Sequence, residues 1–296
     1  MTDPTALSRL PTMAGYRRPK GWVLPRGIAG PLPALGLVLI FFVFPVLALL
    51  LRSFLEPRPG LQNYAEIFAS TTYLRVFENT FTVAALVTAV TLAFGFPVAW
   101  FLAVAPRVWS QILFGIVVLS MWTNLLTRTY AWMVLLQDTG IINRALLSLH
   151  LIARPLPLIN NLVGVVIGMT YILLPFMILP LHAAIRSLDP AIFRAAALCG
   201  ASRWQVFRLV FVPLLASGIG AGVLMVFVMA LGYYVTPALL GGTANMMLAE
   251  LIAQLVQSLL NWGLGGAAAL LLLVVTLGLY AVQFRFFGFG TLRGRR

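Results

Sequence analysis

The residues of this chain that could do chemistry are few. A nucleotide phosphate loop needs a lysine followed by serine or threonine after a glycine. The only lysine, Lys20, is followed by Gly21, so the chain cannot supply that loop. The sequence offers no paired carboxylates, metal-ligand cluster or nucleophile–base arrangement, and His150 and His182 fall at the edges of apolar segments. We therefore expect no catalytic centre, no metal site and no cofactor bound by this chain.

The composition is that of an integral membrane protein. Hydrophobic residues make up 61% of the 296 residues and charged residues only 9%, whereas a soluble domain carries about 25% charged residues. The net charge of +13 is spread over short stretches between apolar runs. It therefore indicates membrane topology rather than a nucleic-acid site. The single cysteine, Cys199, excludes an intramolecular disulfide.

Apolar runs long enough to cross a bilayer recur along the chain. We expect an all-α membrane domain at residues 31–285, between a basic N-terminal tail (1–30) and a basic C-terminal tail (286–296). Pro45, Pro175 and Pro180 fall inside predicted spans, and the last two should kink theirs. The six expected spans cover about residues 32–51, 80–105, 111–127, 161–181, 212–234 and 263–284.

The charged residues orient these spans. An even number of spans places both termini on one side of the membrane. The two tails, Arg107, Arg285 and the connection between the fourth and fifth spans hold 14 of the 20 basic residues. Because basic residues stay in the cytoplasm, we expect both termini and that connection to be cytoplasmic. The acids of the opposite side are Glu56, Glu66, Glu78, Asp138 and Glu250.

The connection at residues 187–212 has an unusually complete set of local signals. Asp189 can cap a helix whose first residue is Pro190, and Gly200 can end that helix. Ser202 and Gln205 have the spacing of a capping box, which starts a second helix. We expect two short helices joined by a tight turn outside the bilayer, a docking element. Trp204, Phe207 and Phe211 fall on one side of the second helix.

The predicted spans contain no ionisable residue in their cores. Proton- and voltage-driven carriers usually keep such residues there, and Arg128 and Glu250 lie outside the assigned boundaries. Energy for transport should therefore come from outside the chain, through the docking element. A secondary carrier and a membrane-embedded enzyme or scaffold remain as alternatives.

Ala195-Ala196, Gly200-Ala201-Ser202, Phe207 and Val212-Pro213 resemble the cytoplasmic EAA loop of ABC importer permeases. The resemblance implies that this loop is a coupling helix, which fits a groove on a separate ATPase subunit. Arg194 stands where that family usually has glutamate, so the charge is reversed. The coupling residues implied by the resemblance are Asp189, Arg194, Ala195, Ala196, Gly200, Ala201, Ser202, Phe207 and Pro213.

Further segments are similar to the spermidine/putrescine branch of these permeases: Arg128–Trp132, Gly140–Asn143, Val235–Gly242 and Asn261-Trp262. Gly263 replaces the proline that commonly follows in that branch. This similarity implies a six-span, MetI-like type I permease of the bacterial inner membrane. Its implied partners are a second permease, an extracytoplasmic binding protein and an ATPase dimer, which binds ATP and Mg. An amino-acid derivative, thiamine, iron or an oxyanion remains an alternative solute.

A polyamine path would need aromatic faces for cation–π contact, and amides that face lipid are costly. The aromatic residues could equally pack against lipid or form an interfacial belt. A path without acids suits transit rather than tight binding, which leaves selectivity to the binding protein. The expected path residues are Asn79, Trp122, Asn124, Tyr171, Tyr233, Tyr234 and Thr236.

Overall fold

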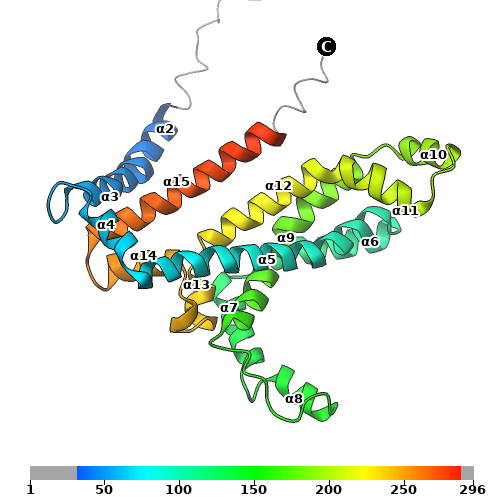
Figure 1. Cartoon of the computed structure of the whole chain (residues 1–296). Helices are drawn as coiled ribbons and strands as arrows, with labels where there is room; N and C mark the ends of the chain where they lie inside the picture. Colours follow the sequence, from blue (N-terminus) through cyan, green and yellow to red (C-terminus); the bar gives the residue numbers. More distant parts are fainter. Residues whose placement is uncertain (1–31, 288–296) are drawn as a thin grey trace, which may run out of the picture. The chain divides into compact units, whose positions relative to one another are not determined.

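The computed structural model describes residues 32–287, and the regular structure in that range is helical throughout, as predicted (Figure 1). Contacts divide the chain into two units, one ending at Ala48 and one beginning at Leu49. Nothing of the predicted basic tail at residues 1–30 lies inside the described range. Of the predicted C-terminal tail, residues 288–296 lie outside it, and Phe286 and Phe287 continue the last helix.

Five helices in the described range are long and apolar enough to cross a membrane, or up to six if one bent pair is a single span. They confirm the predicted existence of spans 1, 2, 4, 5 and 6, although their ends differ. The five run over Pro33–Leu55, Thr71–Val104, Leu162–Arg186, Arg203–Leu231 and Trp262–Arg285.

The first span consists of α2 (Leu32–Val38), the π-helix η2 (Leu39–Val43) and α3 (Phe44–Leu55). The N–H of Phe44 donates to the carbonyl of Leu39, five residues back, just before Pro45. Such π turns let a helix continue past a residue that disturbs its ordinary hydrogen bonds. The span therefore crosses Pro45 without ending.

The helix that contains the predicted second span begins before that span. Helix α4 (Gln62–Ala69) is followed by α5, which begins at Thr71 and ends at Val104, with Pro97 inside it. Glu78 and Asn79 lie inside α5 and not at its start. A helix can include such polar side chains where it extends beyond the apolar layer of the membrane. Hydropathy marks where a helix becomes apolar, and α5 begins before that point.

The helix of the third span begins and ends earlier than the predicted span. Helix α6 (Arg107–Trp122) stops before Asn124, and α7 (Leu125–Leu136) and α8 (Ile141–Ser148) follow at a bend of 101°. The Oδ1 of Asn124 accepts the N–H of Leu126 at 2.8 Å, so it caps α7. The expected continuation to residue 127 fails because Asn124 begins a new helix in a new direction.

The fourth span, α9 (Leu162–Arg186), contains both Pro175 and Pro180 and extends beyond its predicted end. After α10 (Pro190–Leu198), the chain forms α11 (Arg203–Gln205), η3 (Val206–Phe211) and α12 (Val212–Leu231). These three are one continuous helix. The expected second short helix is therefore the beginning of span 5, because the π turn of η3, where Val212 N–H donates to the Phe207 carbonyl, carries the chain past Pro213.

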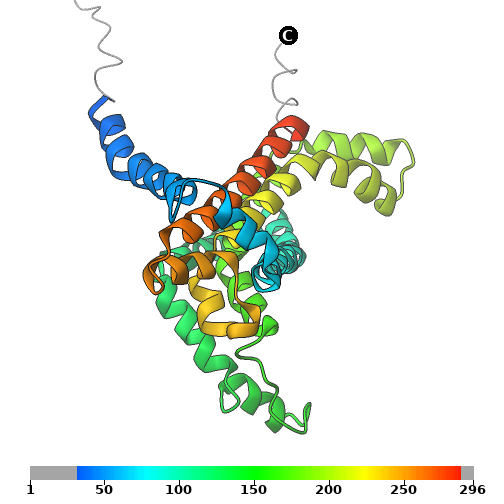
Figure 2. The ribbon, with the colours of Figure 1, turned by 60° about the vertical axis from the view of Figure 1, so that its left-hand side comes forward.

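Span 5 ends at Leu231, so Tyr233 and Tyr234 follow it rather than end it. The short helices α13 (Val235–Leu240), η4 (Thr243–Asn245) and α14 (Leu248–Gln257) lead to the last span, α15 (Trp262–Phe287). Helix α8 precedes α9 in the chain and α10 follows it, and these two short helices lie at opposite ends of α9 (Figures 1 and 2).

Helices α5, α9 and α12 form the main core. Their buried side chains include Val87 of α5, Met177 of α9 and Val226 of α12. Glycines bring the helices close: a Cβ added at Gly222 would lie 2.9 Å from the sulfur of Met177. Small residues at such interfaces permit the van der Waals packing on which membrane helices depend.

Replacement of Gly218 in α12 by valine should lower the thermal stability of the purified protein. A Cβ at this position would lie 2.3 Å from the Cβ of Ala184, and overpacking of this kind costs about 1–3 kcal/mol. Gly278→Val in α15 is the control, since no atom lies within 4 Å of its Cβ position. An equal loss of stability in both variants, measured by thermal unfolding, would contradict the close contact between α9 and α12.

Candidate functional site

The local signals of residues 187–212 are confirmed where they concern helix ends. The Oδ1 of Asp189 accepts the N–H of Ala191 at 2.8 Å, and Pro190 is the first residue of α10. Gly200 has φ +80°, the left-handed conformation that glycine adopts most easily. The helix therefore starts and the chain turns at the predicted residues.

The capping box is present as well. The Oγ of Ser202 accepts the N–H of Gln205 at 3.3 Å, and the N–H of Ser202 donates to Oε1 of Gln205 at 2.8 Å. These reciprocal bonds fix the first turn of α11. Since α11 continues into α12, the turn at Gly200 is held directly on the end of a membrane-spanning helix.

An aromatic cluster connects α10 to the C-terminal end of α5. Phe211 is only 4% exposed, and its ring centroid lies 4.5 Å from that of Trp100 and 6.0 Å from that of Phe193. Phe207 stacks on Phe211 at 5.7 Å, and Trp204 stacks on Phe207 at the same spacing. The predicted one-sided row of aromatic residues is therefore real, and its inner end contacts α5.

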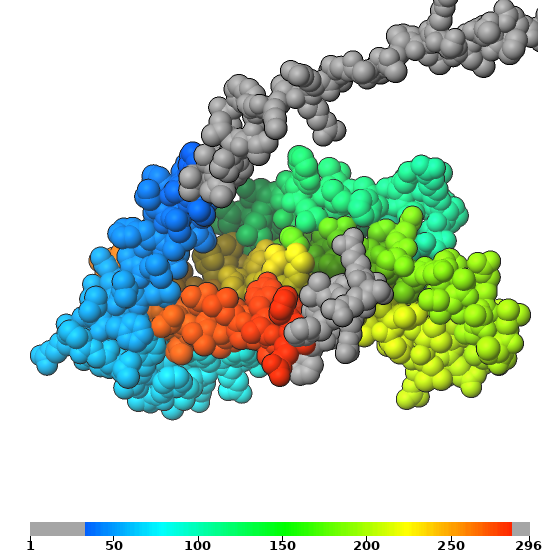
Figure 3. Space-filling view, turned by 90° about the horizontal axis from the view of Figure 1, so that it is seen from above, coloured from blue at the N-terminus to red at the C-terminus, as the bar shows by residue number. Residues whose placement is uncertain are grey.

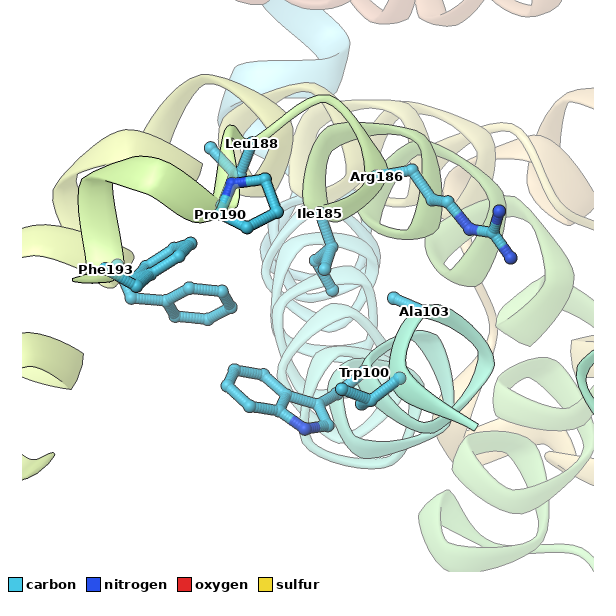
Figure 4. Close-up of a pocket in the computed structure, with 9 residues that line it drawn as sticks. Trp100, Ala103, Ile185, Arg186, Leu188, Pro190 and Phe193 are labelled. Atoms are coloured by element: carbon cyan, nitrogen blue, oxygen red, sulfur yellow. The ribbon is translucent and has the colours of Figure 1, made fainter. Parts of the chain in front are cut away.

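The cluster leaves open space on both sides of Trp100. A cavity of about 370 Å³ is lined by Trp100, Phe193 and Phe211, with Ile185 and Pro190. In Figure 4 the side chains of Trp100, Ile185, Pro190 and Phe193 lie around it, while the guanidinium of Arg186 points away. A shallow, open depression of about 620 Å³ lies where Pro97, Trp100 and Phe207 meet. Because apolar side chains line most of both spaces, the connection between α10 and α5 is an apolar contact.

The outer side of α10 is uncovered. None of the residues of α10 is buried, and Leu198 is 89% exposed. In Figure 3 the yellow-green atoms of this part of the chain are visible at the surface. Arg194, Ala195, Gly200, Ser202 and Pro213 are exposed, Ala196 and Ala201 are half-buried, and Phe207 belongs to the aromatic cluster.

The predicted polar path residues have partners within the chain. Thr236 is fully buried, with its hydroxyl 3.3 Å from that of Thr129. The amide of Asn79 donates to the carbonyl of Ala244 at 3.0 Å, and Asn124 caps α7. Their exposure to a path therefore stays a prediction.

The predicted aromatic residues fall into two groups. Tyr171 contacts Trp132 of α7 edge-to-face at 5.5 Å. Burial raises the pKa of the Tyr233 phenol, and the charge of Arg128 on α7 opposes that shift. Trp122 is 85% exposed and Tyr234 46% exposed. The structure thus brings Tyr171, Tyr233 and Thr236 to α7, and leaves the other two aromatic side chains on the surface.

Sequence reasoning missed the residues of α7 that receive these contacts. They are Arg128, Thr129 and Trp132. All three lie in the segment that resembles the polyamine branch, but its similarity alone did not mark them as path residues. A second missed group is Glu250 of α14, where burial raises the carboxyl pKa and a hydrogen bond from the backbone of Met247 opposes the shift.

Residues 95–286 match the family described as "Binding-protein-dependent transport system inner membrane component". The chain belongs to this family. A spermidine/putrescine transport system permease protein, PotB, of Haemophilus influenzae is 35% identical over 257 residues, covering 83% of this chain and 89% of the relative. PotB of Escherichia coli K12 is 33% identical over 246 residues, covering 80% and 89%. A probable molybdenum ABC transporter permease of Haloferax volcanii is 28% identical, covering 83% and 85%.

Solved structures share the fold. A crystal structure of a bacterial ABC transporter that imports alginate matches with TM-score 0.65 and 22% identity, covering 87% of this chain and 94% of the other. The same type of transporter bound to its periplasmic protein matches with TM-score 0.68 and 21% identity, covering 87% and 92%. The predicted class, an all-α MetI-like permease of an ABC importer, is confirmed. The chain is thus an inner-membrane transport component of a non-enzymatic family.

Gly200→Val should loosen α10. No atom lies within 4 Å of the Cβ position of Gly200, so the cost comes from the left-handed backbone and not from a clash; it is about 1–2 kcal/mol. Hydrogen exchange of the α10 amides should be several times faster in this variant and unchanged in α9. Gly200→Asn is the matched control, since asparagine tolerates this conformation. An unchanged exchange rate of the α10 amides in the valine variant would show that the left-handed turn at Gly200 does not stabilise α10.

Proposed function

We propose that this chain is the membrane-spanning subunit of an ATP-driven polyamine importer for spermidine or putrescine. The observation that carries this proposal is its identity of 33–35% to spermidine/putrescine permeases over about four fifths of its length. The solute would arrive from an extracytoplasmic binding protein, in keeping with the description of the family.

In this proposal α10 is the coupling helix. It docks on a separate ATPase dimer that binds ATP and Mg, and a second, related permease completes the path. Support comes from the uncovered surface of α10 and from the contact of Phe211 with Trp100, which joins the docking segment to α5. The charge distribution favours a cytoplasmic position for both termini and α10, the side on which ATP is available.

The chemistry near α7 and α14 suits the passage of a cation without tight binding. The faces of Tyr171 and Trp132 could each contribute about 0.5–2 kcal/mol of cation–π attraction. Glu250 supplies one carboxyl, and its Oε2 is buried with no hydrogen-bond partner among the described residues. A single acid holds a polycation weakly, so selectivity would lie in the binding protein.

An oxyanion such as molybdate is the second candidate. Arg128 favours it, because this half-buried side chain beside Tyr233 has an Nε atom without a hydrogen-bond partner in the described part of the chain. An anion would be attracted by this arginine and a polyamine repelled. The similarity to a probable molybdenum permease also favours an oxyanion, although the identity of 28% is lower than that to the polyamine permeases.

Uptake of both solutes decides between these candidates. The chain is expressed with its ATPase, second permease and binding protein in a host that lacks polyamine and molybdate import. We expect labelled spermidine or putrescine uptake at least tenfold above the background, and molybdate uptake at the background. An ATPase variant without its phosphate-loop lysine, at equal abundance, should abolish uptake. Uptake of molybdate without uptake of a polyamine would assign an oxyanion as the solute. Uptake of neither solute would contradict both candidates.

A further inference from the structure

The uncovered docking segment has one sign of charge. Arg186, Arg194, Arg203 and Arg208 are all exposed, and none of them forms an ion pair; among the described residues the one ion pair joins Arg52 and Glu56. The only acid between residues 186 and 213 is Asp189. Since its Oδ1 already accepts the N–H of Ala191, Asp189 serves as the cap of α10. The surface offered to a partner is therefore basic.

The same surface is apolar at two points. Leu198 is 89% exposed at the end of α10, and Trp204 is 67% exposed just after the turn. A nine-residue helix without a buried residue has little stability of its own. Burial of Leu198 and Trp204 against a partner would supply about 25 cal/mol for each Å² of apolar surface removed from water.

The arrangement fits a protein groove better than a membrane surface. A helix that lies in the bilayer interface has its apolar residues on one face and its charges on the other. In α10 the aromatic residue Phe193 is turned toward Phe211, inside the protein. Arg194 and Leu198 are four residues apart and so share the outer face. A face that mixes a leucine with an arginine matches an apolar socket with a charged rim.

We infer that the ATPase groove that receives α10 is acidic, with carboxylates opposite Arg194 and Arg203 around an apolar socket for Leu198. This inference rests on the proposed function, since it assigns the charge of the partner at the proposed docking site. Complementary charges of this kind speed association and exclude wrong partners, because like charges placed opposite each other are strongly unfavourable. An ATPase with a basic groove would therefore not be a partner of this chain.

The single lysine of the chain makes a direct test possible. In a Lys20→Arg background, Arg194→Lys or Arg203→Lys introduces a lysine amine at the docking segment. The assembled transporter is treated with a carbodiimide, which joins an amine to a carboxylate in contact with it. We expect mass spectrometry to find either lysine coupled to an aspartate or glutamate of the ATPase. Arg144→Lys, at an exposed arginine of α8, is the matched control and should give no such product.

Labelling of Cys199 separates failure of this inference from failure of the docking proposal. Cys199 is exposed, and the ATPase should protect it from maleimide. Protection without coupling to the ATPase would leave docking intact and contradict the acidic groove. The absence of both would contradict docking itself. Coupling to a second copy of this chain, or protection of Cys199 by anionic vesicles without the ATPase, would assign the surface to that copy or to lipid and overturn the inference.

Discussion

The contact between Phe211 and Trp100 is the interaction on which the proposed mechanism depends. The docking segment has no buried residue in α10, and the ring of Phe193 joins it to the nearly buried ring of Phe211. Trp100 then carries the contact to α5. Aromatic pairs contribute about 0.5–1.5 kcal/mol each beyond the area that they bury. The pair of Phe193 with Phe211 therefore holds α10 to the start of span 5, and the pairs of Phe211 with Phe96 and Trp100 continue the contact to α5, while space remains beside Trp100.

This cluster matters because of the packing behind it. Helices α5, α9 and α12 share one core, in which Gly218 and Gly222 allow α12 to lie close to α9. Tightly packed interiors transmit displacement because their side chains have few alternative positions. A movement of α10 that displaces Phe211 would thus reach α5 and α9 together, and through α9 the contacts of Tyr171 and Thr236 with α7.

Local signals in the sequence predicted the docking segment well. The cap at Asp189 and the box formed by Ser202 and Gln205 depend on residues two or three positions apart, so the sequence contains both partners of each bond. The helix ends outside this segment were predicted less well. Hydropathy could not detect the polar start of α5 at Thr71, and the second short helix was expected to be separate from span 5, whereas a π turn carries it past Pro213 into that span.

The contacts between distant residues were beyond the sequence. Thr129 and Thr236 are joined across more than one hundred residues, and nothing in their surroundings in the sequence indicates the pairing. Trp100 likewise lies in an apolar span, where any aromatic residue is expected to face lipid as readily as protein. Only the packing of α5 beside α12 identifies it as the neighbour of Phe211.

The most direct test of this account measures how many solute molecules are imported for each ATP hydrolysed by the reconstituted transporter. Trp100→Ala and Phe211→Ala should each lower this ratio at least fivefold while ATPase binding is retained. The double variant should lose little more, because both changes remove the same contact. Trp109→Ala, which removes an exposed tryptophan of α6, should leave the ratio unchanged. A wild-type ratio in the two single variants, or losses that multiply in the double variant, would contradict a coupling route through this contact.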